Sequence, residues 1–179
     1  GVMETVEKSV NPKSLSLILK KAIKQALKQL QQMRSKEGQH LCKDLSKRLS
    51  KLRLMTKRVS KRAPQVIVVH RKRLIERLSK ADIDVHDVND ERFLREVVYF
   101  TDRSDITEEL TRLESHFEQM ESCLTVVEPV GRKLDFLAQE MFREVNTIGS
   151  KANDSVISNE VVALKTELEK IREQVQNVE

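Results

Sequence analysis

Hydrophobic residues in the first part of the chain recur at the spacing of an α-helix. From Lys13 to Ser79 only Gly38 and Pro64 interrupt a pattern in which apolar residues fall every three or four positions. Such spacing lines them up along one face of a helix. The sequence therefore predicts one very long amphipathic helix, kinked or divided at Pro64, because proline removes a backbone donor and clashes with the preceding turn. The apolar positions are Ile23, Leu27, Leu30, Leu41, Leu45, Leu49, Leu52, Met55 and Val59.

The chain changes character after this segment. Residues 81–90 are acidic and show no periodicity, which indicates a linker. Asn89 and Asp90 are suitable N-caps for a helix that begins at Glu91. A break at 101–104 is expected to precede a further helix with one apolar stripe. The positions of that stripe are Ile106, Leu110, Leu113, Phe117, Met120 and Leu124.

Two more helices are expected in the last part of the chain. One runs from about Val130 toward Ile148 and is predicted to end at Gly149, because glycine favours the C-cap position. Asn153 or Asp154 is expected to cap the final helix. Apolar residues of that helix alternate in steps of four and three, which is the seam of a coiled coil. They are Ile157, Val161, Leu164, Leu168, Ile171, Val175 and Val178.

Composition and charge add to this pattern. One Tyr, five Phe, no Trp, four Gly and three Pro in 179 residues argue against a sheet protein. Residues 1–80 hold 22 basic and 5 acidic side chains, net +17, whereas residues 81–179 hold 11 and 23, net −12. The predicted fold is all-α: a long basic helical arm over 1–80, the acidic linker, and a compact acidic helical bundle over 91–179. The basic half suggests an anionic partner such as nucleic acid; alternatively, the halves neutralise one another in the fold or across a subunit contact.

Four polar residues of the segment DITEELTRLESHF share one helix face. Asp105, Glu109, Arg112 and His116 follow one another at steps of four, three and four. Carboxylate, guanidinium and imidazole groups beside an apolar stripe could bind a metal, orient a phosphate or transfer protons. The alternative is an exposed, ion-paired helix face.

The segment after Pro129 carries a second candidate set. Glu140 and Glu144 lie one helical turn apart, a spacing that suits a hard divalent cation. Donors that suit phosphate oxygens follow an adjacent stripe, namely Arg132, Gln139, Arg143 and Asn146. The alternative is a helix surface whose charges serve solubility.

Several classes of protein are excluded by the sequence. No apolar run approaches the roughly 20 residues that a membrane-spanning helix needs. No phosphate-binding glycine loop, HExxH or GxSxG motif occurs. Cys42 and Cys123 lack the spacing of a zinc site and are expected to be reduced thiols in a reducing cytoplasm.

These segments resemble the YicC/YloC family of bacterial proteins. The resemblance lies in GRKLDFLAQEMFREVNTIGSKAND, DITEELTRLESHF, EGQHL and VVALKTELEKIREQVQNVE. It extends over essentially the whole chain and corresponds to the C-terminal part of a family member, so the family's N-terminal region is expected to be missing. It implies a cytoplasmic endoribonuclease in RNA and small-RNA turnover that uses a divalent cation, manganese or else magnesium. It also implies a homo-oligomer, expected as a hexamer, without membrane contact and with other RNA-decay proteins as further partners.

The resemblance also implies roles for individual residues. The expected metal ligands are Glu109, His116, Asp135, Glu140 and Glu144. Of these, Glu109, His116, Glu140 and Glu144 are expected to be catalytic, with His116 a ligand or a general acid and base. The expected RNA-binding residues are Arg112, Arg132, Arg143 and Lys151. Two alternatives stay open: a non-catalytic RNA-binding adaptor that presents RNA to another ribonuclease, and a helical scaffold.

Overall fold

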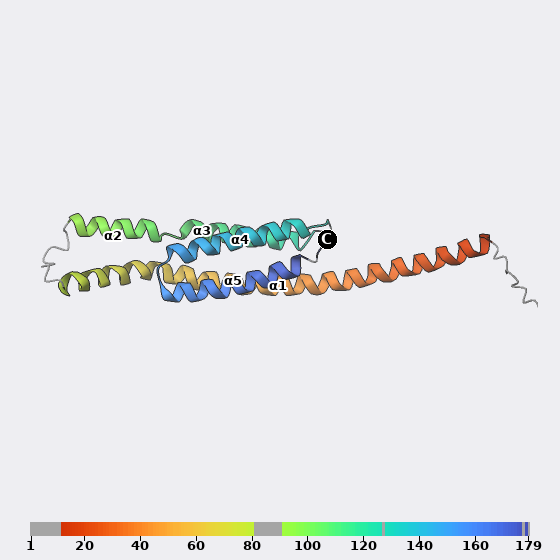
Figure 1. Ribbon diagram of the computed structural model, residues 1–179, viewed down its shortest axis with the longest axis horizontal. Coiled ribbons are helices and arrows are strands. Elements are labelled where there is room, and N and C mark those ends of the chain that lie inside the picture. The colour runs from red at the N-terminus through yellow and green to blue at the C-terminus, as the bar shows by residue number, and fades with distance from the viewer. Residues whose placement is uncertain (1–11, 81–90, 127, 177, 179) are drawn as a thin grey trace, which may run out of the picture. The chain divides into compact units, whose positions relative to one another are not determined.

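The structure is a computed structural model that describes residues 12–80, 91–126, 128–176 and 178 (Figure 1). Its elements are α1 (Pro12–Lys80), α2 (Glu91–Ser104), α3 (Thr107–Cys123), α4 (Gly131–Lys151) and α5 (Ser155–Val175). No strand occurs in these ranges, so the predicted all-α class is confirmed. Within the same ranges, no helix is both long enough and apolar enough to cross a lipid bilayer. The predicted linker over 81–90, with its caps Asn89 and Asp90, lies outside the described residues.

Packing divides the chain into two compact units, Gly1–Lys43 and Asp44–Glu179. Helix α1 contributes to both. The charge-based division at Lys80 therefore does not coincide with the division by packing. In the first unit the apolar face of α1 is exposed to solvent. Its exposed large apolar residues are Leu15, Leu17, Ile18, Leu19, Ile23, Leu27, Leu30 and Met33.

In the second unit the rest of α1 packs with α3, α4 and α5 around one core (Figure 1). The predicted stripe of α1 is buried from residue 45 onward: Leu45, Leu49, Leu52, Met55 and Val59. The predicted seam of α5 is buried as well: Ile157, Val161, Leu164, Leu168, Ile171 and Val175. Val178 lies beyond the end of α5. Periodicity thus located the core faces of both helices.

Helix α1 continues through Pro64 without interruption. Of the two outcomes predicted for Pro64, a kink or a division of the helix, the division does not occur. Proline costs an interior hydrogen bond, but Val59 and Val66 on either side of it are buried. Burial of the flanking turns in the core offsets the cost of the missing bond.

Gly149 lies inside α4, so its predicted role as the C-cap is also wrong. The helix continues to Lys151, and Ala152 takes the C-cap position. The glycine instead allows α5 to approach, because a Cβ built on it would lie 3.0 Å from Cγ1 of Val161. A contact between helices, which local sequence does not encode, explains this glycine.

Asp154 caps α5, as predicted. Its carboxylate accepts hydrogen bonds from the backbone N–H groups of Val156 at 3.0 Å and Ile157 at 3.1 Å. Asn153 before it has φ 39°, the left-handed region that asparagine tolerates better than most residues. The guanidinium of Arg62 donates to the same carboxylate at 2.8 Å and lowers the pKa of Asp154.

Basic side chains of α1 pair with acidic side chains of α3 and α5. Arg58 makes two hydrogen bonds to Glu160, both 2.8 Å long. Glu167 is buried and accepts from Lys51 at 2.7 Å and from Arg48 at 3.2 Å. Arg53 contacts two carboxylates of α3, those of Glu114 and Glu121. For these side chains the alternative inferred from charge, mutual neutralisation of the two halves within the fold, is what the structure shows.

Replacing Gly149 by alanine is expected to destabilise the second unit. The new Cβ would press on the buried, β-branched Val161, which has little rotamer freedom. Overpacking of this kind lowers the free energy of unfolding by about 1–2 kcal/mol. Thermal unfolding of Gly149→Ala measures the effect, with Gly38→Ala as the control. A Cβ at Gly38 meets nothing within 4 Å, so this change should be neutral or stabilising. A Gly149→Ala variant as stable as the wild type would contradict the close packing of Val161 against Gly149.

Acid unfolding is expected to report on Glu167. Hydrogen bonds from Lys51 and Lys170 lower the pKa of Glu167 to about 2. A lowered folded-state pKa stabilises the protein above the unfolded-state value, and the gain is lost as pH falls from about 5 to 2. This gain in stability is on the order of 2 kcal/mol, because solvent reaches both lysines and screens their charges. Glu167→Gln should be less stable than the wild type at neutral pH and equal to it near pH 2. Denaturant unfolding across this range checks the prediction. Glu169→Gln, at an exposed position, should follow the wild type throughout.

Candidate functional site

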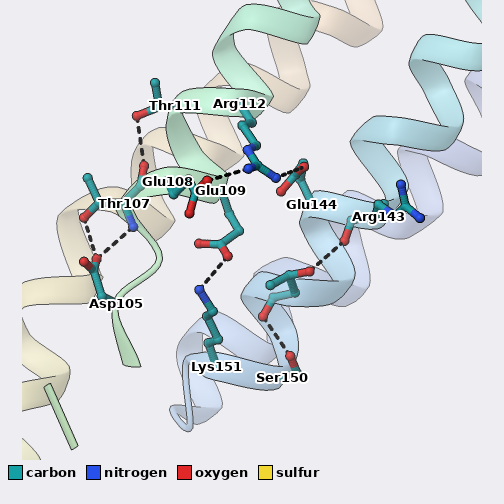
Figure 2. A network of polar contacts seen from close by, with 11 residues as sticks. Asp105, Thr107, Glu108, Glu109, Thr111, Arg112, Arg143, Glu144, Ser150 and Lys151 are labelled. Carbon is teal, nitrogen blue, oxygen red and sulfur yellow. Dashed lines mark hydrogen bonds and ion pairs between the residues drawn. The ribbon is translucent and has the colours of Figure 1, made fainter. Parts of the chain in front are cut away.

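A group of charged side chains joins the start of α3 to the end of α4 (Figure 2). We define the α3–α4 polar network as Asp105, Glu108, Glu109, Arg112, Glu144 and Lys151. The sequence placed Asp105, Glu109 and Arg112 on one face of a helix. The structure turns Glu109 and Arg112 of that face toward α4.

Glu109 and Lys151 form the tighter of the two links between the helices. Nζ of Lys151 donates to Oε1 of Glu109 over 2.6 Å. The hydrogen bond to Glu109 raises the pKa of Lys151. Glu109 is 6% exposed, and its other oxygen, Oε2, is buried without a hydrogen-bond partner among the described residues. One oxygen of a buried carboxylate is therefore left available to a further donor or cation.

Arg112 forms the second link. Its guanidinium contacts Oε1 of the buried Glu144 at 3.5 Å and also donates to Glu108 one turn before it. The negative charges of Glu108 and Glu144 raise the pKa of Arg112. The side chain of Arg112 is 57% exposed, so an incoming anion can reach it.

The network carries more carboxylates than cations. Asp105 accepts from the hydroxyl and the backbone N–H of Thr107, and these hydrogen bonds lower the pKa of Asp105. The carboxylates of the network are Asp105, Glu108, Glu109 and Glu144, and the cations are Arg112 and Lys151. Its net charge is therefore negative, which favours binding of a cation.

The other predicted site residues lie outside this network. Glu140 is half-buried and contacts Arg143 on its own helix at 3.4 Å. Asp135 accepts from Gln139 at 2.7 Å and lies 3.9 Å from Arg172 of α5. Arg132 is exposed on the same helix. His116 is half-buried, and its Nδ1 has no hydrogen-bond partner among the described residues.

The predicted metal ligands do not converge within the described residues. No group of three or more His, Cys, Asp or Glu side chains there is arranged to hold an ion. Glu109 and Glu144 instead have basic partners from the facing helix. The charge of the network and the unpaired, buried oxygen of Glu109 suit a divalent cation, but the described side chains do not make up its full ligand set.

Two features of the structure are not among the predictions made from the sequence. Phe136 is 58% exposed on α4, on the side that carries Arg132 and Arg143. Phe136 lies four positions after Arg132 and three before Gln139, so helical spacing places it on the same stripe as these two residues. The second feature is a cavity of about 590 Å³ that α2, α4 and α5 line together, with Lys151 among the lining residues. No local signal predicts it, because its walls are far apart in the sequence.

Comparisons with known proteins show which family this chain belongs to. The family described as "Endoribonuclease YicC-like, C-terminal" matches residues 59–179, and the chain belongs to it. A protein of Clostridioides difficile named "Probable endoribonuclease YicC" is 40% identical over 178 residues, 99% of this chain. One of the same name from Haemophilus influenzae is 34% identical over 179 residues, the whole chain. The chain spans 61% of the length of each relative. The family predicted from the sequence segments is thereby confirmed.

Removing the ammonium group of Lys151 is expected to leave the buried carboxylate of Glu109 without a counterion. Lys151→Met should lower the free energy of unfolding by about 2 kcal/mol, because Glu109 then lacks its cation. Adding Glu109→Gln should recover most of that loss, since a neutral amide needs no counterion. Arg143→Met, at a side chain 75% exposed, is the control and should change stability by less than about 0.5 kcal/mol. A double variant no more stable than Lys151→Met would contradict the pairing.

Proposed function

We propose that this chain is the part of an endoribonuclease that holds RNA and cuts its phosphodiester bonds. The observation that carries the proposal is the α3–α4 polar network, in which the buried Glu109 and Glu144 lie beside Arg112 and Lys151. Membership of a family described as endoribonuclease YicC-like supports the same activity. So do the names of the two relatives.

The network offers groups that phosphodiester cleavage requires. Lys151 uses one of its three N–H donors for Glu109, so two can meet phosphate oxygens. The exposed guanidinium of Arg112 can offer further donors to the charge that develops in the transition state. Buried carboxylates can accept a proton from an attacking water or hydroxyl. We assign general base catalysis to Glu109 or Glu144 and phosphate binding to Arg112 and Lys151.

The proposal includes a divalent cation, manganese or magnesium. Its full ligand set is not assembled by the described side chains, so no step of the chemistry is assigned to it. We further propose a homo-oligomer, a hexamer, in which a neighbouring copy supplies the missing ligands. The exposed apolar side chains of α1 between Leu15 and Met33 support association, because large apolar patches rarely stay open to water. The proposed compartment is the cytoplasm, and the proposed role is the turnover of RNA, including small RNA.

Cleavage of an end-labelled hairpin RNA by the purified chain tests the activity. The reaction is run with manganese, with magnesium and with EDTA. We expect metal-dependent cutting that falls by at least about a hundredfold in Glu109→Gln and Glu144→Gln. Glu118→Gln is the matched control, since Glu118 is exposed on α3. Circular dichroism and RNA binding of every variant show whether a loss is chemical.

The variants Glu140→Ala and His116→Ala test the rest of the predicted site. Loss of cutting in either would extend the site beyond the α3–α4 polar network, toward the middle of α3 and α4. If all four variants cut at the wild-type rate, the site assignment is wrong. If the wild-type chain and a full-length relative both bind RNA without cutting it in any metal, the endoribonuclease proposal is wrong.

A second candidate is a non-catalytic RNA-binding adaptor. The observation that favours it is that Glu109 and Glu144 have basic partners and that no three potential ligands converge in the described residues. An adaptor would bind RNA with strong salt dependence through lysine and arginine side chains. It would show no cutting that responds to EDTA, so the same assay separates the two functions.

A further inference from the structure

A cavity of about 590 Å³ lies between the second half of α2, the end of α4 and the start of α5. Its volume is within the range of sites that bind small molecules. The side chains used in the argument below are Glu96, Tyr99 and Arg103 of α2, Lys151 of α4, and Ser155 and Ser158 of α5.

One wall of the cavity presents three different chemical groups in order. Glu96, Tyr99 and Arg103 follow one another on α2 at steps of three and four, so they share one helix face. Tyr99 lines the cavity and is 62% exposed, so a ligand in the cavity can reach it. Arg103 forms no ion pair with any residue that the structure describes, whereas Arg95 on the same helix is paired with Glu91. A carboxylate, an aromatic ring and an uncompensated guanidinium are therefore aligned.

The opposite wall adds a second cation and hydroxyl groups. Nζ of Lys151 donates to Glu109 and has two further donors. Ser155 and Ser158 are also part of the lining, and the hydroxyl of Ser158 donates to the backbone carbonyl of Asp154. Asp154 lines the cavity too, but Arg62 compensates its charge and its carboxylate already caps α5. An anion in the cavity would therefore be held by Arg103 and Lys151 and not by the start of α5.

We propose that this cavity binds one unpaired nucleotide of an RNA chain, with a preference for guanine. The phosphate would meet Arg103 and Lys151, as guanidinium and ammonium groups bind phosphate oxygens. The base stacks on Tyr99, as unpaired bases do on exposed aromatic rings. Guanine presents two adjacent N–H donors at its pairing edge, which match the two oxygens of Glu96. Adenine presents one donor and one acceptor there, and the acceptor would face the carboxylate.

This inference rests on the proposed function in naming RNA as the source of the nucleotide. Lys151 connects the cavity to Glu109, so the bound phosphate lies beside the α3–α4 polar network. Binding of the nucleotide can be measured in EDTA, with no cleavage. Failure of this inference and failure of the endoribonuclease proposal therefore give different results.

Fluorescence anisotropy with labelled single-stranded hexanucleotides, one G and five U or one A and five U, tests the site in EDTA. Arg103→Gln and Tyr99→Leu should each weaken binding of the G-containing strand about tenfold. Arg95→Gln is the matched control on the same helix and should bind within about twofold of the wild type. Since all of these side chains are exposed, melting temperatures should not change.

The base preference and the source of the nucleotide are tested separately. Glu96→Gln should remove the preference for G over A and leave binding of the A-containing strand within about twofold of the wild type. Free guanosine monophosphate should compete at least about tenfold less well than the G-containing strand, because it lacks the adjoining phosphates.

Several results would overturn the inference. Equal losses in Arg103→Gln and Arg95→Gln would mean that only general charge matters. Unchanged binding in Tyr99→Leu would remove the stacking contact. Guanosine monophosphate that binds as tightly as the strand would make the ligand a free nucleotide and not RNA.

Discussion

The fold of the second unit depends on one constraint: each carboxylate that is buried in its core needs a cationic partner from another helix. Glu109, Glu144 and Glu167 are nearly inaccessible, and each has a basic partner on a facing helix. An unmatched buried charge would cost several kcal/mol. Two of these pairs fix how α3 faces α4, and the third fixes how α5 faces α1. Lys151 is both the counterion of Glu109 and part of the cavity lining, so an anion bound in the cavity would share one ammonium group with a core carboxylate.

Most of the fold could be predicted from the sequence, because it depends on periodicity. The stripe from Leu45 to Val59 and the seam of α5 are buried where their spacing placed them. The errors have a common cause in tertiary contacts. Local sequence predicts a helix end at Gly149, but this glycine lies inside α4 and makes room for Val161. A division of α1 at Pro64 does not occur, because the helix is buried on both sides of this residue.

The candidate site could be predicted only in part. Helical spacing brought Asp105, Glu109 and Arg112 to one face, and the structure pairs two of them with Glu144 and Lys151. Spacing along one helix does not say which side chains of another helix face it. The sequence therefore could not show that the contacts of Glu140 and Asp135 are with Arg143 and Arg172 and not with the network. It could not reveal the cavity either, whose walls come from three helices.

The turn between α4 and α5 has a consequence for the order of folding. Only Ala152, Asn153 and Asp154 separate the two helices, so these neighbours can pair with little loss of chain entropy. The contacts of α1 are different, since Arg62 and Asp154 are 92 positions apart and Lys51 and Glu167 are 116 apart. During synthesis the bundle part of α1 leaves the ribosome long before α5 does. The part of its apolar stripe that α5 covers is therefore exposed until the last helix has emerged, and exposed apolar surface of this kind promotes aggregation of a folding chain.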